Sequence, residues 1–302
     1  MTRPPPDRQI SRSEGQGGGR IGSPTRSVTR TLPRPRSSAS ILHSSSGTTR
    51  RDLSLCLDLH EHRVLTTQQI FELRFPSPRR TQRRLLILQQ RGSVERFRPF
   101  RSTGSHPWHY ILGEVGIEIV ASWRGVERKE IGLRMDRLRR IAYSPRLAHL
   151  VEVNGFFSRL SYRCRTARHL ELVEWWSERR CAAEWRGMVR PDGMGRLEGP
   201  GADVRFFLEL DRGTESSSRL EEKLTRYARV ARLADAPEAL LFLFPTERRE
   251  AEARRALINC GMLVLTGSRG VAGEDPLSPC WLPIGGDRRL RITDVGSARR
   301  AG

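Results

Sequence analysis

The first stretch with a clear apolar pattern runs from about residue 50 to residue 92 and predicts three helices. The first helix is expected to contain Leu53, Leu55, Leu57 and Leu59. Thr66 followed three residues later by Gln69 predicts a capping box that starts a short second helix. Ser77 and Pro78 are typical of an N-cap and a first helical residue, so a third helix should begin there and end at the next glycine.

Two short apolar runs follow, at residues 94–98 and 108–112, and a basic loop with Gly and Ser joins them. We interpret them as paired strands. Three helices followed by a hairpin predict a winged helix-turn-helix domain over residues 50–123, with the third helix in the major groove of DNA. The alternative is a solvated arginine face on a protein-binding domain. The residues expected to contact DNA are Arg79, Arg80, Gln82 and Arg83 on the helix, and Arg98 and Arg101 in the wing.

The second half of the chain predicts an α/β fold. Residues 124–145 are highly charged and are expected to be a partly helical linker. The pattern from residue 146 to residue 268 is helix, three strands, helix, strand, helix, strand, which predicts a central mixed sheet. Residues 269–302 are expected to form an irregular C-terminal tail. The expected elements are a helix at 146–163, a strand at 172–183, a hairpin at 190–211, a helix capped by Ser218, and strands at 239–244 and 262–266 flanking a helix at 247–259.

The hairpin carries the first candidate chemistry. A turn at Pro200 and Gly201 would place Asp192 directly opposite Glu209, with Cβ atoms about 5 Å apart. Like charges at that distance repel, and a divalent cation held by oxygen ligands would compensate them. The alternative is a different register with both carboxylates in solvent. Alternation along the third strand places four side chains on one face: Arg205, Phe207, Glu209 and Asp211.

Other polar residues are weaker candidates. Glu178 could be a further acid from the first strand of the sheet, and a salt bridge to a neighbouring arginine is an equal alternative. His60 and His62 flank a glutamate at a helix end and are expected at the surface.

Composition points to a polyanionic partner. The 302 residues suffice for two domains, and 54 Lys and Arg against 34 Asp and Glu give a formal net charge of +20. We expect that partner to be double-stranded DNA, with a basic but inert surface as the alternative.

Cysteine spacing and hydropathy indicate a cytoplasmic protein without a membrane span. The five cysteines lie far apart with no C-x-x-C pair, which argues against a zinc site or a disulfide framework. The longest apolar run, Ala239 to Phe244, is far too short to cross a bilayer. Residues 1–48, rich in Ser, Gly, Pro and Arg, are expected to be a disordered basic tail: a DNA-binding arm, a transit peptide or an upstream translation artefact.

The hairpin also carries a resemblance. Pro191-Asp192 followed by Glu209-x-Asp211 resembles the Asp…(Asp/Glu)-x-Lys pattern of the PD-(D/E)xK nuclease-like superfamily. The resemblance implies that Asp192 and Glu209 bind magnesium and that a lysine positions or activates the attacking water. This chain departs from the pattern because Asp211 occupies the position of the lysine.

The missing cation has few candidates, because the chain has only two lysines, Lys129 and Lys223. Lys223 lies in the next predicted helix, about 60° from its buried stripe at ~100° per residue, and some members of the superfamily carry the lysine on that helix. Arg212 is an alternative; otherwise the site is degenerate. The candidate catalytic residues are therefore Asp192, Glu209, Asp211 and Lys223.

A narrower resemblance rests on three segments: residues 174–183, residues 190–193, and residues 207–215. Over roughly residues 50–265 they resemble the actinobacterial replication-relaxation family, which is associated with plasmids, mobile elements and DNA binding. The resemblance implies a DNA-binding protein that acts in replication, relaxation or transfer and carries a nuclease-like domain. The alternatives are an active Mg-dependent endonuclease and a winged-helix transcription regulator whose α/β domain mediates assembly, for instance as a homodimer.

Overall fold

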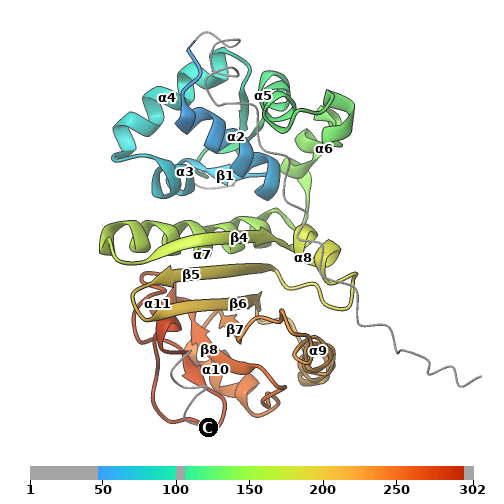
Figure 1. Ribbon diagram of the computed structural model, residues 1–302, viewed down its shortest axis with the longest axis vertical. Helices are drawn as coiled ribbons and strands as arrows, with labels where there is room; N and C mark the ends of the chain where they lie inside the picture. Colours follow the sequence, from blue (N-terminus) through green and yellow to red (C-terminus); the bar gives the residue numbers. More distant parts are fainter. Residues whose placement is uncertain (1–46, 100–105, 296–302) are drawn as a thin grey trace, which may run out of the picture. The chain divides into compact units, whose positions relative to one another are not determined.

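The computed structural model of the chain describes residues 47–99 and 106–295 (Figure 1). Most of the expected basic tail (residues 1–46) and Arg101 of the expected wing lie outside these ranges. Within them, no helix is both long enough and apolar enough to cross a membrane. The five cysteines are buried and free.

The N-terminal part of the described chain is mainly helical, with a three-stranded sheet. The sheet has the order β1-β3-β2, and both pairings are antiparallel. Its elements are α2 (Arg50–His62), β1 (Leu65–Thr66), α3 (Thr67–Arg74), α4 (Pro78–Gln90), β2 (Val94–Phe97), β3 (His109–Leu112), α5 (Glu114–Arg124), η1 (Arg128–Ile131), α6 (Met135–Arg140) and η2 (Ile141–Tyr143).

Local hydrogen bonds start the helices where the sequence predicted. The Thr66 N–H donates to Gln69 Oε1 at 2.9 Å, and Thr66 Oγ1 accepts from the Gln69 N–H, which completes the capping box of α3. Ser77 caps α4 by accepting from the Arg80 N–H, and Pro78 follows as the first helical residue. Both predicted caps are confirmed.

The segment expected to be a linker belongs to the N-terminal core. Ile131, Met135 and Leu138, from η1 and α6, are buried in the same cluster as Leu55 and Leu85. The charged residues between them lie on the outside, so the high charge of residues 124–145 reflects the exposed side of short packed helices.

The second part is an α/β fold around a mixed sheet, which confirms the predicted class. The strand order is β4-β5-β6-β7-β8-β9; β4, β5 and β6 are antiparallel, whereas β6, β7 and β8 are parallel. The elements are α7 (Leu147–Ala167), β4 (Glu171–Ser177), α8 (Glu178–Glu184), β5 (Gly193–Gly199), β6 (Ala202–Leu210), α9 (Ser217–Val230), β7 (Ala239–Phe244), α10 (Glu247–Arg254), β8 (Leu263–Ser268), α11 (Arg269–Ala272), β9 (Leu282–Pro283) and η3 (Ile292–Asp294).

Among the element boundaries that differ from the prediction, two differ because serines cap helices there, and the helix expected over 247–259 ends at Arg254. The strand expected over 172–183 ends at Ser177, whose side chain accepts from the Arg180 N–H and starts α8. The cap of α9 is Ser216 instead of Ser218. In each case the side chain satisfies a backbone donor that the first helical turn leaves free.

Both faces of the six-stranded sheet are covered. Phe157 and Leu160 of α7 pack on one face with Phe206 and Leu208, and α8, α9 and α10 cover the other, where Phe207 is buried. Residues 269–295, expected as an irregular tail, complete the α7 face: Trp281 is fully buried and its Nε1 donates to the Pro276 carbonyl at 3.0 Å.

Helix α7 also contacts the N-terminal part through buried polar groups. Asn154 Nδ2 donates to the Val64 carbonyl at 2.7 Å, and Gln69 Nε2 donates to the Val151 carbonyl at the same distance. Buried hydrogen bonds of this kind are costly to leave unmade, so α7 joins the two cores.

Candidate functional site

The hairpin pairs in the register that the sequence predicted. In β5 and β6 Gly193 lies opposite Leu208, and the pairing continues in step to the turn. Asp192 and Glu209 lie one residue beyond that pair. Asp192 Oδ2 accepts a hydrogen bond from the Leu210 N–H at 2.8 Å, which holds the carboxylate at the end of the strand pair.

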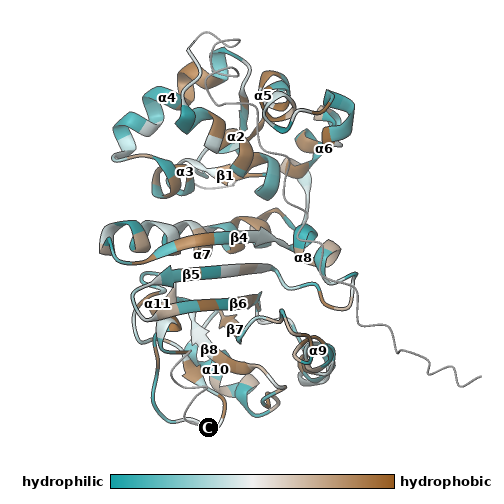
Figure 2. Cartoon of the chain, in the orientation of Figure 1, coloured by the Kyte–Doolittle hydropathy of each residue, from teal (hydrophilic) through white to brown (hydrophobic). Residues whose placement is uncertain are grey.

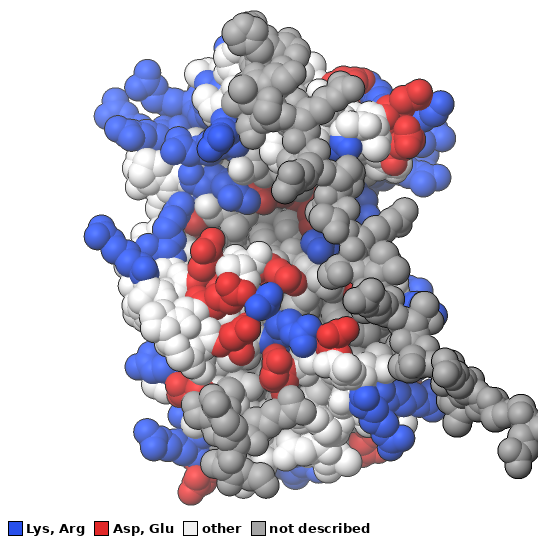
Figure 3. All heavy atoms as spheres, in the orientation of Figure 1, with Lys and Arg blue, Asp and Glu red and all other residues white. Residues whose placement is uncertain are grey.

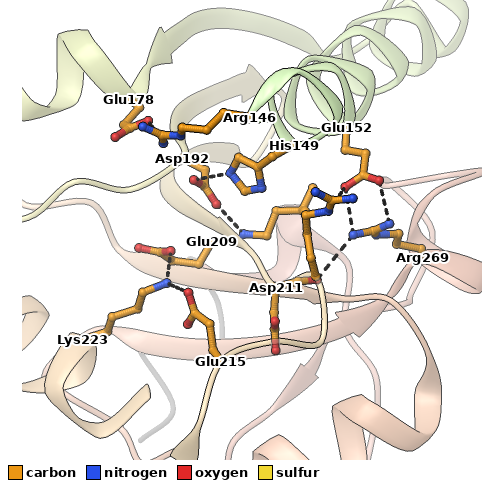
Figure 4. A network of polar contacts seen from close by, with 12 residues as sticks. Arg146, His149, Glu152, Glu178, Asp192, Glu209, Asp211, Glu215, Lys223 and Arg269 are labelled. Carbon is orange, nitrogen blue, oxygen red and sulfur yellow. Dashed lines mark hydrogen bonds and ion pairs between the residues drawn. The ribbon is translucent and has the colours of Figure 1, made fainter. Parts of the chain in front are cut away.

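Glu209 faces α9 and is bound by two of its side chains. Its Oε2 accepts from Lys223 Nζ at 2.8 Å, and its Oε1 accepts from the Tyr227 hydroxyl at 2.5 Å. Lys223 Nζ also donates to Glu215 Oε1 at 2.7 Å. The Lys223 ammonium therefore points toward the acid-bearing strand (Figure 4).

Burial shapes the electrostatics of this group. Burial raises the pKa of Glu209 to about 7, and the Asp192 charge adds to the rise while Lys223 and Tyr227 oppose it. Burial also disfavours the Lys223 ammonium, but the charges and hydrogen bonds of Glu209 and Glu215 outweigh it and raise the Lys223 pKa. Because Glu215 is a second acidic partner, the ammonium keeps a counter-ion even when Glu209 is protonated.

Asp192 has a partner that the sequence analysis missed. His149 of α7 lies with its Nε2 2.7 Å from Asp192 Oδ1, 43 residues away in sequence. This hydrogen bond, more than the burial that opposes it, raises the pKa of His149. One signal could have found it: Arg146, His149 and Glu152 recur every three residues and form a polar face on the predicted helix.

Asp211 does not join this group. Its Oδ1 accepts from the Gly213 N–H at 2.6 Å and its Oδ2 lies 2.8 Å from Arg249 Nη2, so the carboxylate closes a turn and binds α10. Arg212, the alternative cation, pairs with Glu152 of α7 at 3.6 Å. The alternation that placed Asp211 beside Glu209 fails because β6 ends at Leu210.

A cavity of about 300 Å³ lies beside Asp192 and His149. Glu178, the first residue of α8, lines it and forms a 2.7 Å ion pair with Arg146, which is the salt-bridge alternative. The remaining lining residues come from the end of α2, from α7 and from the region of β4 and α8: Glu61, His62, Arg63, Leu150, Val153, Asn154, Trp175, Ser177 and Arg179.

His60 and His62 are buried, so their expected surface position is wrong. The His62 ring stacks on Trp175 with centroids 3.4 Å apart. Burial lowers the pKa of His60 to about 4 and that of His62 to about 3, so both rings are neutral near neutral pH. His62 belongs to the contact between α2 and β4, and His60 to the contact between α2 and α5. Only the tertiary structure reveals these roles.

The residues present are compatible in kind with a magnesium ion. Among the described residues, no group of three or more His, Cys, Asp and Glu side chains is arranged as a metal centre. However, Mg²⁺ commonly takes one or two carboxylates and completes its shell with water and phosphate oxygens. Asp192 and Glu209 supply two carboxylates, each of whose oxygens accepts one hydrogen bond and has a further lone pair.

Helix α4 presents the predicted DNA-binding residues to solvent. Arg79, Arg80, Gln82 and Arg83 are all exposed, and the first turns of α4 are hydrophilic in Figure 2. Figure 3 shows Lys and Arg gathered over this helix. The next arginine, Arg84, turns inward instead: its Nε donates to Asp52 Oδ1 at 2.8 Å.

Of the two arginines expected to contact DNA from the wing, only Arg98 lies within the residues that the structure describes. Arg98 is exposed and its guanidinium lies 4.1 Å from the centroid of the Trp108 ring, as does that of Arg96. Such cation–π contacts orient a guanidinium without neutralising it.

A family model described as replication-relaxation matches residues 57–241, about three fifths of the chain. No curated protein and no solved structure matches the chain.

Proposed function

Because the chain belongs to the replication-relaxation family, we propose that it is a DNA-binding protein of a plasmid or other mobile element that acts in replication, relaxation or transfer. In this proposal α2, α3, α4 and the β2–β3 hairpin form a winged helix, and α4 enters the major groove of double-stranded DNA. The chain's formal net charge of +20 favours the same partner.

One observation carries this proposal. Four neighbouring polar residues at the start of α4 are exposed, and no ion pair joins any of the three arginines among them to an acid in the described chain. Arg84, by contrast, is used internally. Exposed guanidinium groups without an internal partner remain available to a ligand, and their donor geometry matches phosphates and guanine edges.

The test is binding of a labelled 30-base-pair duplex by the full chain at several salt concentrations. Replacing Arg79, Arg80 and Arg83 together by Ala should weaken binding at least 100-fold at 100 mM salt. It should also flatten the slope of log affinity against log salt by about 3, close to 0.9 for each phosphate that is no longer neutralised. Arg232→Ala, at an exposed arginine after α9, is the control. Unchanged binding by the triple variant would rule out α4 as the recognition helix.

A specific observation favours a second activity, Mg-dependent endonuclease cleavage. The order α7, β4, β5, β6, α9, β7, α10, β8 follows the nuclease-like core, interrupted by α8. Asp192 stands before β5, Glu209 near the end of β6, and Lys223 on the following helix. In this proposal the three residues would take the places of the superfamily's two acids and of its migrated lysine.

The roles of these residues follow from their contacts. His149 and the Leu210 N–H would hold the Asp192 carboxylate in place, and Tyr227 and Lys223 would hold Glu209. A bound magnesium ion would polarise the phosphate and lower the pKa of a bound water. The Lys223 ammonium, kept charged by Glu215, would stabilise negative charge on the scissile phosphate.

Cleavage of supercoiled plasmid with and without magnesium tests this second activity. Asp192→Ala and Glu209→Ala should each abolish nicking and leave duplex affinity within about twofold, because neither residue lies on α4. Asp203→Ala, at an exposed acid that pairs with Arg196, is the matched control. If the wild type nicks no form of DNA with any metal, only the binding function stands. Binding confined to one sequence would then favour the transcription regulator.

A further inference from the structure

A second group of arginines lies at the junction of three helix ends. Arg63 follows the last residue of α2, Arg124 is the last residue of α5, and Arg179 lies in the first turn of α8. Arg124 Nη2 lies 3.2 Å from His60 Nδ1, which ties α5 to α2. Arg179 Nη2 donates to Glu61 Oε2 at 3.1 Å, which ties α8 to α2. We call these three arginines the junction cluster.

The acidic side chain at the junction does not neutralise the three guanidinium groups of the junction cluster. Glu61 is its acid, and it is largely engaged: Oε1 accepts from the Ser177 hydroxyl at 2.6 Å and Oε2 from Arg179. In the described part of the chain, no ion pair joins Arg63 or Arg124 to an acid. Arg63 Nη1 is moreover buried and has no hydrogen-bond partner among the described residues.

The guanidinium groups are close enough to disfavour one another's charge. Burial lowers the pKa of Arg63 to about 10, with the charge of Arg179 as the next contribution and that of Arg124 a smaller one. Burial likewise lowers the pKa of Arg124, and the charge of Arg179 adds to the effect. A fold gains nothing from such repulsion, whereas an anion bound between the three groups would relieve it.

The position of the cluster indicates which anion. Arg63 and Arg179 line the same cavity as Asp192 and His149. A strand whose phosphate bound the cluster would therefore enter the cavity toward Asp192. Guanidinium groups match phosphate oxygens with paired donors.

We propose that Arg63, Arg124 and Arg179 form a binding site for a backbone phosphate of a nucleic acid strand, and that this site guides the strand toward Asp192. The inference rests on the proposed DNA-binding function and adds a second contact region, separate from α4. The site takes the phosphate diester of a nucleic acid; inorganic pyrophosphate serves as a small probe because it offers the same kind of phosphate oxygens to the guanidinium groups.

The test uses the full chain with the double variant Arg63→Gln/Arg124→Gln and the control Arg232→Gln. Affinity for the labelled duplex should fall at least 10-fold at 100 mM salt, and the slope of log affinity against log salt should flatten by about 1, the value for one phosphate. In phosphate-free buffer, the melting temperature of the double variant should equal or exceed that of the wild type, because repulsion is removed. Pyrophosphate should raise the melting temperature of the wild type more than that of the variant.

Arginines at helix C-termini also stabilise helix dipoles, and melting separates this purely structural role from the proposed one. A lower melting temperature in both the double variant and Arg124→Gln would overturn the proposal, even if affinity falls. A change in duplex affinity below twofold would also overturn it, even if pyrophosphate binds. Other results would show that the proposed DNA-binding function itself is wrong. In that case the wild type would not bind the duplex, or the α4 triple variant would bind it as tightly as the wild type.

Discussion

The first turns of α4 and the group around Glu209 are both rich in charge, and they use it in opposite ways. On α4, Arg79, Arg80 and Arg83 extend into solvent without an ion pair in the described chain. Around Glu209, every charge meets a partner within hydrogen-bond distance, and Glu209 is only 4% exposed. Residue type alone therefore does not tell what a charged side chain does.

Solvent explains the difference. Water screens the exposed arginines, so they contribute little to folding and stay available for a partner. Burial removes that screening around Glu209, so each charge there depends strongly on its counter-ion. Mutations in the first region should change binding without changing stability, and mutations in the second should change stability first.

The largest expected effect comes from the two lysines. Lys223 and Lys129 each form a 2.8 Å ion pair, but Lys223 is 29% exposed beside a buried acid whereas Lys129 is 79% exposed. Lys223→Ala should lower the free energy of unfolding by about 3–4 kcal/mol at pH 8, because it leaves a buried carboxylate unpaired. Lys129→Ala should cause no measurable change in urea unfolding. An equal loss of unfolding free energy in the two variants would show that burial does not make the Lys223 ion pair more important for stability than the Lys129 ion pair.

The next contrast lies within α4 itself. Arg84→Ala should cost about 2–3 kcal/mol, because it leaves Asp52, which is 1% exposed, without its guanidinium partner. Arg83→Ala, one residue earlier and exposed, should leave the melting temperature unchanged and should weaken DNA binding. Thermal melts and duplex titrations of both variants check this. A loss of stability in Arg83→Ala would contradict the division of the helix into a binding side and a packing side.

The pH dependence of stability should report on Glu209. Its folded pKa of about 7 lies above the ordinary 4.5, so the folded state holds the proton more tightly than the unfolded state. The resulting stabilisation is complete below pH 4.5 and is lost as the pH rises through 7, by about 3 kcal/mol in total. Glu209→Gln cannot titrate, so the difference between wild type and variant in urea unfolding should change over pH 5–8. A constant difference would mean that Glu209 keeps an ordinary pKa.

The smallest effect concerns His149. Its pKa is raised by the hydrogen bond to Asp192, so its stabilisation is complete below pH 6.5 and is lost as the pH rises through the folded value. Asp192→Asn should lower the His149 pKa in an NMR titration, and the control Asp203→Asn should leave it unchanged. An identical His149 titration in all three proteins would show that the contact does not persist in solution.

Most of the helix starts and the hairpin register could be predicted because their causes are local. Thr66 binds Gln69 three residues away, and Ser77 binds the Arg80 N–H at the same separation. A short turn then forces the pairing of β5 and β6. Such interactions need no knowledge of the rest of the chain.

The remainder depended on partners distant in the sequence. His149 meets Asp192 across 43 residues and Arg84 meets Asp52 across 32. Asp211 follows Glu209 by two positions but binds Arg249 because β6 ends between them.

The sequence by itself determined most of the elements, the mixed α/β class, the basic balance and the family. Only the tertiary structure decided which arginines are neutralised and which remain free, and that residues 124–145 and 269–295 complete cores. The physical reason is that helix caps and tight turns are set by neighbours along the chain. A buried charge is set by whichever group the folded chain brings within a few ångströms, and no local pattern encodes that.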